Sequence, residues 1–194
     1  MDIIRLFFLA LAQILFAAVN ESPTEGKEMG EIPDDKVYPG GRMDRTYKSR
    51  IIFGVIFAWF TFSNIYRYGD VPLTYLEWFV CLMMVTSAAL RLYCYWTLGS
   101  MFTFKLGIRA DHELIQTGPY KYLIHPSYTG QILFMSSYMC FHGINIILIG
   151  CLTAYVIYRL RTRMANEESM MEMKFGPKYK EYINKHWRLL PYIY

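Results

Sequence analysis

The chain has 194 residues, of which 54% are hydrophobic, 18% aromatic and only 19% charged, and its formal net charge is +4. This composition is too apolar for an ordinary soluble domain of this length. The basic residues lie next to long apolar segments, which indicates contact with anionic lipid head groups rather than with nucleic acid.

Four long apolar segments follow one another along the chain. They cover residues 3–19, 51–66, 73–98 and 129–158. About 20 apolar residues cross a bilayer as a helix, so each of the first three predicts one membrane span. The fourth is too long for one ordinary span and has a polar break at residues 141–145, which predicts two antiparallel helices. The sequence therefore predicts an all-α polytopic membrane protein with five transmembrane helices.

Lys and Arg residues are distributed unevenly among the connecting segments. Six lie in residues 20–50, three in residues 99–127 and eight in residues 159–194. With five spans, these three segments all lie on one face of the membrane. The positive-inside rule makes that face cytoplasmic, so we expect the C-terminal segment to form a cytoplasmic helical cap.

The first apolar segment has a second interpretation, a cleaved signal peptide that ends near the small residues Ala17 and Ala18. Its N-terminal region is poorly charged for a signal, because Asp2 offsets Arg5. Cleavage would also leave the basic segment that follows on the outer face. We therefore favour a retained span.

Common catalytic and metal-binding motifs are absent from the sequence. It contains no GxSxG, HExxH, P-loop or Gly-rich dinucleotide fingerprint, which argues against hydrolase, zinc, nucleotide and Rossmann functions. The four cysteines all lie in predicted spans without ligand spacing, so we expect small buried hydrophobic residues rather than a disulfide or metal site. They are Cys81, Cys94, Cys140 and Cys151.

Polar, aromatic and turn-forming residues fill the segment 114–128, directly between two apolar regions. Its Thr-Gly-Pro triplet predicts a turn followed by a short helical piece over residues 119–123. Pro126 ends this piece, and Ser127 is well placed to cap the next helix. His125 is thereby held at a bend close to the membrane surface.

Two interpretations fit Tyr120, His125 and Tyr128. In the first, these amphipathic side chains anchor a loop at the membrane interface, and composition alone favours this reading. In the second, they offer imidazole and phenol groups to a cofactor in a small polar pocket.

A second polar cluster follows the last apolar segment. Arg159, Arg163 and Glu167 are spaced four residues apart, so they line one face of a helix that continues out of the membrane, beside a row formed by Glu168 and Glu172. Ion pairs worth about 0.2–0.5 kcal/mol each would explain this face. Alternatively, the arginine binds a carboxylate or phosphate, and a glutamate one turn away holds an amine, a ribose or a cation.

Gly176 and Pro177 predict the end of that helix and the start of another. In the second helix Tyr179, Tyr182 and Ile183 share an apolar face. We expect it to fold back over the polar cluster and to close a site from the cytoplasmic side.

Several short motifs occur together in residues 105–194. They are HELI at residues 112–115, GPY ending at Tyr120, HPSY at residues 125–128, then Arg163, Glu167, Glu168 and FGPKYKEY from Phe175. With these motifs, residues 105–194 resemble the catalytic half of isoprenylcysteine carboxyl methyltransferases, and the combination is far more specific than any one motif.

The resemblance implies roles for particular residues. Arg163 is implied to bind the carboxylate of a prenylcysteine, and Arg163 and Glu167 are the candidate catalytic residues. No metal ligand is implied. Contacts with S-adenosylmethionine are implied for Lys105, His112, Glu113, Leu114, Ile115, Tyr120, His125, Pro126, Ser127, Tyr128 and Glu167.

The same resemblance implies methylation of the C-terminal prenylcysteine of lipidated proteins, in the endoplasmic reticulum membrane, with the active site and C-terminus facing the cytoplasm. Together with the predicted spans, it divides the chain in two. Residues 1–98 form an N-terminal membrane region with three spans and a cytoplasmic loop. Residues 99–194 form the catalytic region, with a cofactor-binding segment, a hairpin of two spans and the C-terminal cap.

One position departs from the family. An arginine usually precedes the histidine of the HPSY-like motif, and this chain has Ile124 there. The role of that arginine is lost or taken over, and Lys121 is the candidate replacement.

Three other functions fit parts of the pattern. A phospholipid N-methyltransferase shares the cofactor but has to remove a proton from its amine acceptor. A sterol reductase ends similarly to the terminal RLLPYIY but is much longer and uses a nicotinamide. In a membrane scaffold without activity, the same residues would simply anchor loops.

Overall fold

The computed structural model describes residues 2–20, 47–68, 70–102 and 113–192. Within these ranges the regular structure is helical, apart from one isolated β-bridge, so the predicted all-α class is confirmed for them. The α-helices are α1 (Ile3–Asn20), α2 (Tyr47–Tyr68), α3 (Tyr75–Leu98), α4 (Pro126–Phe141), α5 (Ile146–Phe175) and α6 (Pro177–Lys185). Two short 3-10 helices, η2 (Gly99–Met101) and η3 (Gly118–Lys121), lie between α3 and α4.

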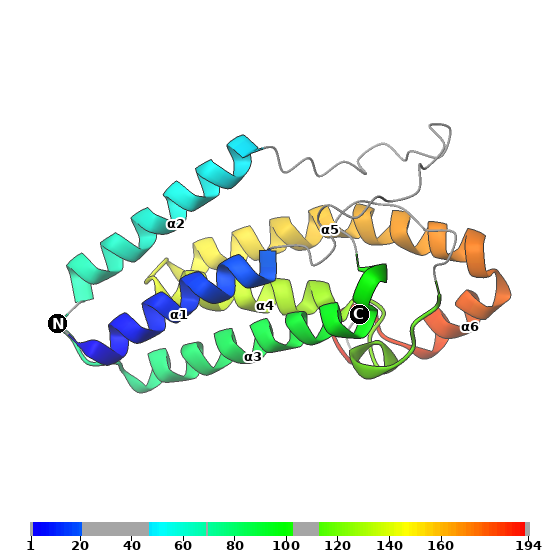
Figure 1. The fold of residues 1–194 in the computed structure, drawn as a ribbon, viewed down its shortest axis with the longest axis horizontal. Helices are drawn as coiled ribbons and strands as arrows, with labels where there is room; N and C mark the ends of the chain where they lie inside the picture. Colours follow the sequence, from blue (N-terminus) through cyan, green and yellow to red (C-terminus); the bar gives the residue numbers. More distant parts are fainter. Residues whose placement is uncertain (1, 21–46, 69, 103–112, 193–194) are drawn as a thin grey trace.

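Four of the helices, α1, α3, α4 and α5, run lengthwise beside one another, whereas α2 diverges from them (Figure 1). The longest helix, α5, extends past the end of α4 that follows η3, and α6 folds back from its tip toward that end. The predicted break at Gly176 and Pro177 is confirmed, since α5 ends at Gly176 and α6 begins at Pro177. This arrangement places a helical cap over the start of α4.

The helices α1 to α5 occupy the five segments predicted to cross a membrane. Among the described residues, one helix, α3, is long and apolar enough to do so, and α1 contains a shorter apolar stretch, Ile3–Ala18. The number of crossings stays a prediction.

The core lies where α3 packs against α4 and α1. Most of its members are apolar side chains that are almost inaccessible to solvent. They are Ala12, Met84, Ala88, Phe134 and Tyr138, with a second group of Leu9, Val80, Cys81 and Phe141. Because this packing joins α3 to α4 across the predicted boundary at residue 98, the two predicted regions share one core, and their division stays a prediction.

The four cysteines differ in burial. Cys81 and Cys94 are buried as expected, and Cys140 is half-buried. The prediction is wrong for Cys151, which is exposed on an apolar face of α5 beside Leu148 and Leu152, which are also exposed. An apolar helix face that no other part of the protein covers has the same hydrophobic sequence as a buried face. Hydrophobicity alone therefore does not predict which cysteines are buried.

Gly130 sets the distance between α3 and α4. A Cβ atom there would lie 3.0 Å from the carbonyl oxygen of Ser87 and 3.1 Å from Cβ of Arg91, whereas one at Gly150 would meet nothing within 4 Å. Overpacking of this kind costs about 1–3 kcal/mol. Alanine gains about 1 kcal/mol over glycine within a helix.

We therefore expect Gly130→Ala to lower the midpoint of thermal unfolding in detergent, followed by circular dichroism. Gly150→Ala, the matched control, should leave the midpoint unchanged or raise it. A Gly130→Ala protein as stable as the wild type would show that α3 and α4 do not approach this closely.

Candidate functional site

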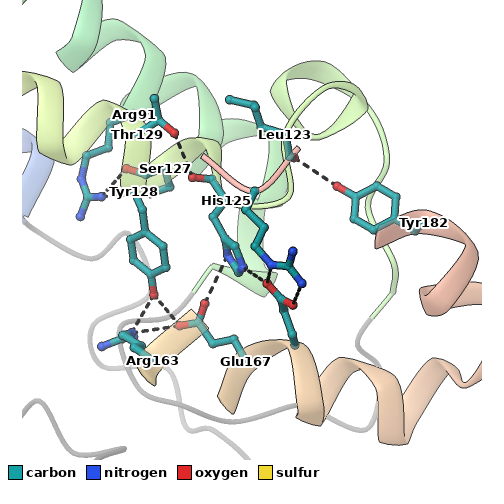
Figure 2. A network of polar contacts seen from close by, with 11 residues as sticks. Arg91, Leu123, His125, Ser127, Tyr128, Thr129, Arg163, Glu167 and Tyr182 are labelled. Atoms are coloured by element: carbon teal, nitrogen blue, oxygen red, sulfur yellow. Dashed lines mark hydrogen bonds and ion pairs between the residues drawn. The ribbon is translucent and has the colours of Figure 1, made fainter. Parts of the chain in front are cut away.

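Polar side chains from α4 and α5 meet at the end of the bundle that α6 covers. His125 precedes α4 and Tyr128 lies in its first turn, while Arg163 and Glu167 lie one turn apart on α5. His125 and Tyr128 point from the start of α4 toward Glu167 and Arg163 (Figure 2). The structure thus brings together the two polar clusters that the sequence separates by 35 residues.

Tyr128, Glu167 and Arg163 form a closed hydrogen-bonded group. The Tyr128 hydroxyl donates to Oε1 of Glu167 at 2.5 Å, and Nε of Arg163 donates to the same Oε1 at 2.9 Å and to the Tyr128 oxygen at 2.7 Å. Burial lowers the pKa of the Arg163 guanidinium, but Tyr128 and Glu167 raise it by more. The pKa is therefore above its ordinary value, and the guanidinium stays charged. The prediction that Arg163 and Glu167 share one face of a helix is confirmed, and their ion pair is partly buried. A role of this face in ligand binding stays a prediction.

A second group links His125, Glu168 and Arg188. Nε2 of His125 lies 3.1 Å from Oε1 of Glu168, and the Arg188 guanidinium donates to Oε1 and Oε2 of Glu168, each at 3.0 Å. Burial would raise the pKa of the Glu168 carboxyl, but the hydrogen bonds from His125 and Arg188 outweigh it and hold that pKa below its ordinary value. Since an ionised carboxylate only accepts hydrogen bonds, the proton in this contact belongs to Nε2 of His125.

The two adjacent glutamates differ in what they leave available. Both oxygens of Glu168 are taken by His125 and Arg188, and its side chain is 14% exposed. Glu167 is 28% exposed and uses Oε1 alone for hydrogen bonds within the described part of the chain, since Nδ1 of His125 is 3.7 Å from its Oε2. Glu167 therefore keeps an oxygen for a ligand, whereas Glu168 is occupied structurally.

Arg91 holds the start of α4 from the other side. This buried arginine of α3 donates through Nη1 to the backbone oxygen of Ser127 at 2.9 Å and to its Oγ at 3.0 Å. The prediction that Ser127 caps α4 is wrong, because the N-cap residue is His125 and the Ser127 hydroxyl is directed to Arg91. Arg91 was visible in the sequence as a basic residue in the middle of the apolar segment 73–98, and basic residues inside a membrane span are rarely incidental.

The C-terminal segment pairs with the backbone before α4. Leu123 and Trp187 form a parallel β-bridge, in which the N–H of Ile124 donates to the Trp187 oxygen at 2.8 Å. The N–H of His125 donates to the Arg188 oxygen at 3.0 Å. These bonds fix His125 against a segment more than 60 residues later in the chain.

Tyr182 of α6 fastens the same region through its side chain. Its hydroxyl donates to the backbone oxygen of Tyr120 at 2.7 Å. It also lies 3.2 Å from the backbone oxygen of Leu123 (Figure 2). Its ring packs with Tyr179 and Ile124 in a buried cluster. Burial raises the pKa of the Tyr182 phenol, so the hydroxyl stays protonated and able to donate. These contacts confirm that the last helix folds back onto the segment before α4.

The remaining residues implied by the resemblance lie around this centre or outside the described ranges. Lys105 and His112 fall outside them. Glu113 is exposed, Leu114 and Ile115 are half-buried, and Pro126 is fully buried. Tyr120 is buried and its hydroxyl bonds to Cys94 of α3, so it lies on the α3 side together with Ser127. Their cofactor roles stay predictions.

The contact between Arg188 and Glu168 escaped sequence reasoning. Arg188 is one of eight basic residues after the last apolar segment, and no spacing marks it as a partner of Glu168. Lys121, the candidate for the missing arginine, is exposed and lies over the ring of Tyr122, 5.9 Å from its centroid.

No group of three or more metal-ligating side chains occurs in the part of the chain that the structure describes.

Comparisons with known proteins point to one family. The sequence model of the isoprenylcysteine carboxyl methyltransferase (ICMT) family matches residues 78–173. The chain is 30% identical over 138 residues to the protein-S-isoprenylcysteine O-methyltransferase of Dictyostelium discoideum, covering 70% of this chain and 55% of that protein. It is 28% identical over 127 residues to a probable protein-S-isoprenylcysteine O-methyltransferase of Oryza sativa subsp. indica, covering 60% and 63%.

A solved structure shares the fold. The eukaryotic intramembrane Ras methyltransferase ICMT superimposes with a TM-score of 0.62 at 20% sequence identity, over 96% of this chain and 63% of that one. The chain thus spans between about half and two thirds of the length of the relatives it matches.

The role of Tyr182 leads to a stability prediction. Tyr182→Phe removes the donor to the backbone oxygen of Tyr120, and leaving such a group unsatisfied costs about 1–3 kcal/mol. We expect the thermal midpoint to fall and limited proteolysis to cut the C-terminal segment faster. The control is Tyr179→Phe, because the Tyr179 hydroxyl makes no hydrogen bond within the described residues and its ring stays. Equal behaviour of the two variants would contradict the docking role.

Proposed function

We propose that the chain belongs to the isoprenylcysteine carboxyl methyltransferase family, whose sequence model matches residues 78–173, and that it methylates the C-terminal carboxylate of prenylated cysteine. The observation that carries this proposal is the group formed by Tyr128, Arg163 and Glu167. It lies inside the matched segment and combines a fixed positive charge with a carboxylate oxygen that is left for a ligand. Such a site has two charged ligands to position and needs no nucleophile of its own.

The donor set fits S-adenosylmethionine. This cofactor supplies a methyl group on a positively charged sulfonium, which a carboxylate oxygen can attack directly. It also carries an amine and ribose hydroxyls, for which the Oε2 atom of Glu167 is a suitable acceptor. The ring of Tyr128 adds an aromatic face, which favours a nearby cation. We assign cofactor binding to Glu167, Tyr128 and His125, with the segment 113–115 beside them.

The acceptor requires no general base. A carboxylate is already ionised at neutral pH, so the chain has to hold it in line and to replace the water around it with fixed polar groups. Arg163 supplies the charge that attracts this carboxylate, and Tyr128 and Glu167 keep its guanidinium in place. His125 orients the site, since its Nε2 proton is committed to Glu168.

We assign the site to the cytoplasmic side of the endoplasmic reticulum membrane, with five helices crossing the bilayer. The excess of basic residues in the three connecting segments supports this orientation. The apolar side chains exposed on α5 between Ile146 and Tyr158, on the stretch that leads to Arg163, support sideways entry of a lipid-modified acceptor from the bilayer, while the cofactor enters from the water.

A methyl-transfer assay with two acceptors tests the function. Protein purified in detergent and supplied with methyl-tritiated S-adenosylmethionine should label N-acetyl-S-farnesylcysteine, and base should release the label as methanol, which identifies an ester. Label in phosphatidylethanolamine instead would identify a phospholipid N-methyltransferase. Label in neither, from protein with a cooperative thermal transition, would contradict the proposal.

Arg163 and Glu167 should affect different ligands. We expect Glu167→Gln to weaken S-adenosylmethionine binding in a calorimetric titration, because it removes the charge of the open carboxylate. Arg163→Lys should lower kcat/KM for the acceptor at least about tenfold with cofactor affinity nearly preserved, because lysine lacks the planar fork.

The matched control is Arg159→Lys, an exposed arginine one turn earlier on α5. It should behave as the wild type. If Arg163→Lys and Arg163→Ala both turned over the acceptor at the wild-type rate, Arg163 would form only an ion pair and would not bind the acceptor.

A further inference from the structure

Arg188 is connected to His125 in two ways, directly through its backbone and indirectly through Glu168. Its backbone oxygen accepts the N–H of His125 at 3.0 Å. Its guanidinium holds both oxygens of Glu168 at 3.0 Å, and Oε1 of the same Glu168 accepts Nε2 of His125 at 3.1 Å. The three residues therefore form a closed ring of contacts that fixes both ends of the histidine, its backbone and its imidazole.

Glu168 transmits the position of Arg188 to the imidazole. A bidentate contact between guanidinium and carboxylate sets the plane of the carboxylate as well as its distance. That plane determines where Oε1 lies, and Oε1 accepts the hydrogen bond from Nε2 of His125. With the proton on Nε2, Nδ1 is left facing Oε2 of Glu167, 3.7 Å away, on the side assigned to the cofactor.

The chain supplies this charge from an unusual place. Ile124 stands where the resemblance implies an arginine, and its side chain is buried with Tyr179 and Tyr182. Its N–H pairs with the oxygen of Trp187, which brings the next residue, Arg188, beside His125. Position 124 thus carries an apolar side chain, and the positive charge beside His125 comes from Arg188 in the C-terminal segment.

We propose that Arg188 is a positioning residue for methyl transfer, which acts through Glu168 to fix the ring and the tautomer of His125. It takes the place of the arginine that the resemblance implies before the histidine. The inference rests on the proposed function for its kinetic consequence, but the state of the imidazole can be measured without turnover. Arg188 itself contacts neither cofactor nor acceptor in this proposal.

The kinetic test compares Arg188→Gln, Arg188→Lys and Glu168→Gln. We expect Arg188→Gln to raise the KM for S-adenosylmethionine about tenfold with little change in the KM for the acceptor. Arg188→Lys keeps the charge without the fork and should recover part of the loss. Glu168→Gln should match Arg188→Gln, and the double variant should lose no more than either alone, because both residues act through one contact.

The second measurement is the nitrogen-15 spectrum of the histidine side chains. The chain has 4 histidines, so comparison with His125→Gln assigns the signals of His125. In the wild type the proton should reside on Nε2, and in Arg188→Gln the spectrum should show exchange between tautomers. Lys185→Gln is the control, because Lys185 is exposed and pairs with Glu181 on the same helix, 2.6 Å away, and it should change neither readout.

The outcomes separate the two proposals. A wild type that methylates prenylcysteine, with unchanged KM and unchanged tautomer in Arg188→Gln, would overturn the role of Arg188 and leave the function standing. A wild type without methyl transfer but with the expected tautomer change would leave the positioning contact standing and reject the function. If Arg188→Gln does not fold, Arg188→Lys and Glu168→Gln carry the same test, and wild-type values in both would overturn the inference.

Discussion

Two acidic side chains that are adjacent in sequence, Glu167 and Glu168, lie in one partly buried site. Two negative charges close together repel each other unless each is offset by a positive charge. Here each has its own guanidinium, Arg163 from the same helix and Arg188 from the C-terminal segment. The site therefore forms only when the extension of α5, the start of α4 and the end of the chain meet, and this requirement explains why the cap is tied down through so many contacts.

The two glutamates divide the work of the site. Glu168 is used on both oxygens and fixes His125, while Glu167 is tied through one oxygen and leaves the other to a ligand. On the other side of the start of α4, Arg91 of α3 donates to Ser127. Nearby, Gly130 allows α3 and α4 to approach each other closely. Helix packing in the core thus sets the position of the first turn of α4, and that turn sets the position of Tyr128 toward α5.

Local signals in the sequence predicted the helices and half of the site. The polar break at residues 141–145 and the Gly-Pro pair after α5 end helices for reasons contained in a few residues, and the i, i+4 spacing placed Arg163 beside Glu167. The contact of Arg188 with Glu168 spans 20 residues across a reversal of the chain, and the turn of Ser127 toward Arg91 spans 36. Such contacts depend on how elements dock, which no local pattern records.

The central claim is that S-adenosylmethionine lies between the start of α4 and the extension of α5. Ultraviolet cross-linking of methyl-tritiated S-adenosylmethionine to the purified protein, followed by peptide mapping, tests it most directly. The account predicts that the label falls in the peptides that contain Tyr128 or the segment 163–167, and that excess unlabelled cofactor prevents it. Label confined to α1, α2 or the first half of α3, or label that excess cofactor does not displace, would contradict it.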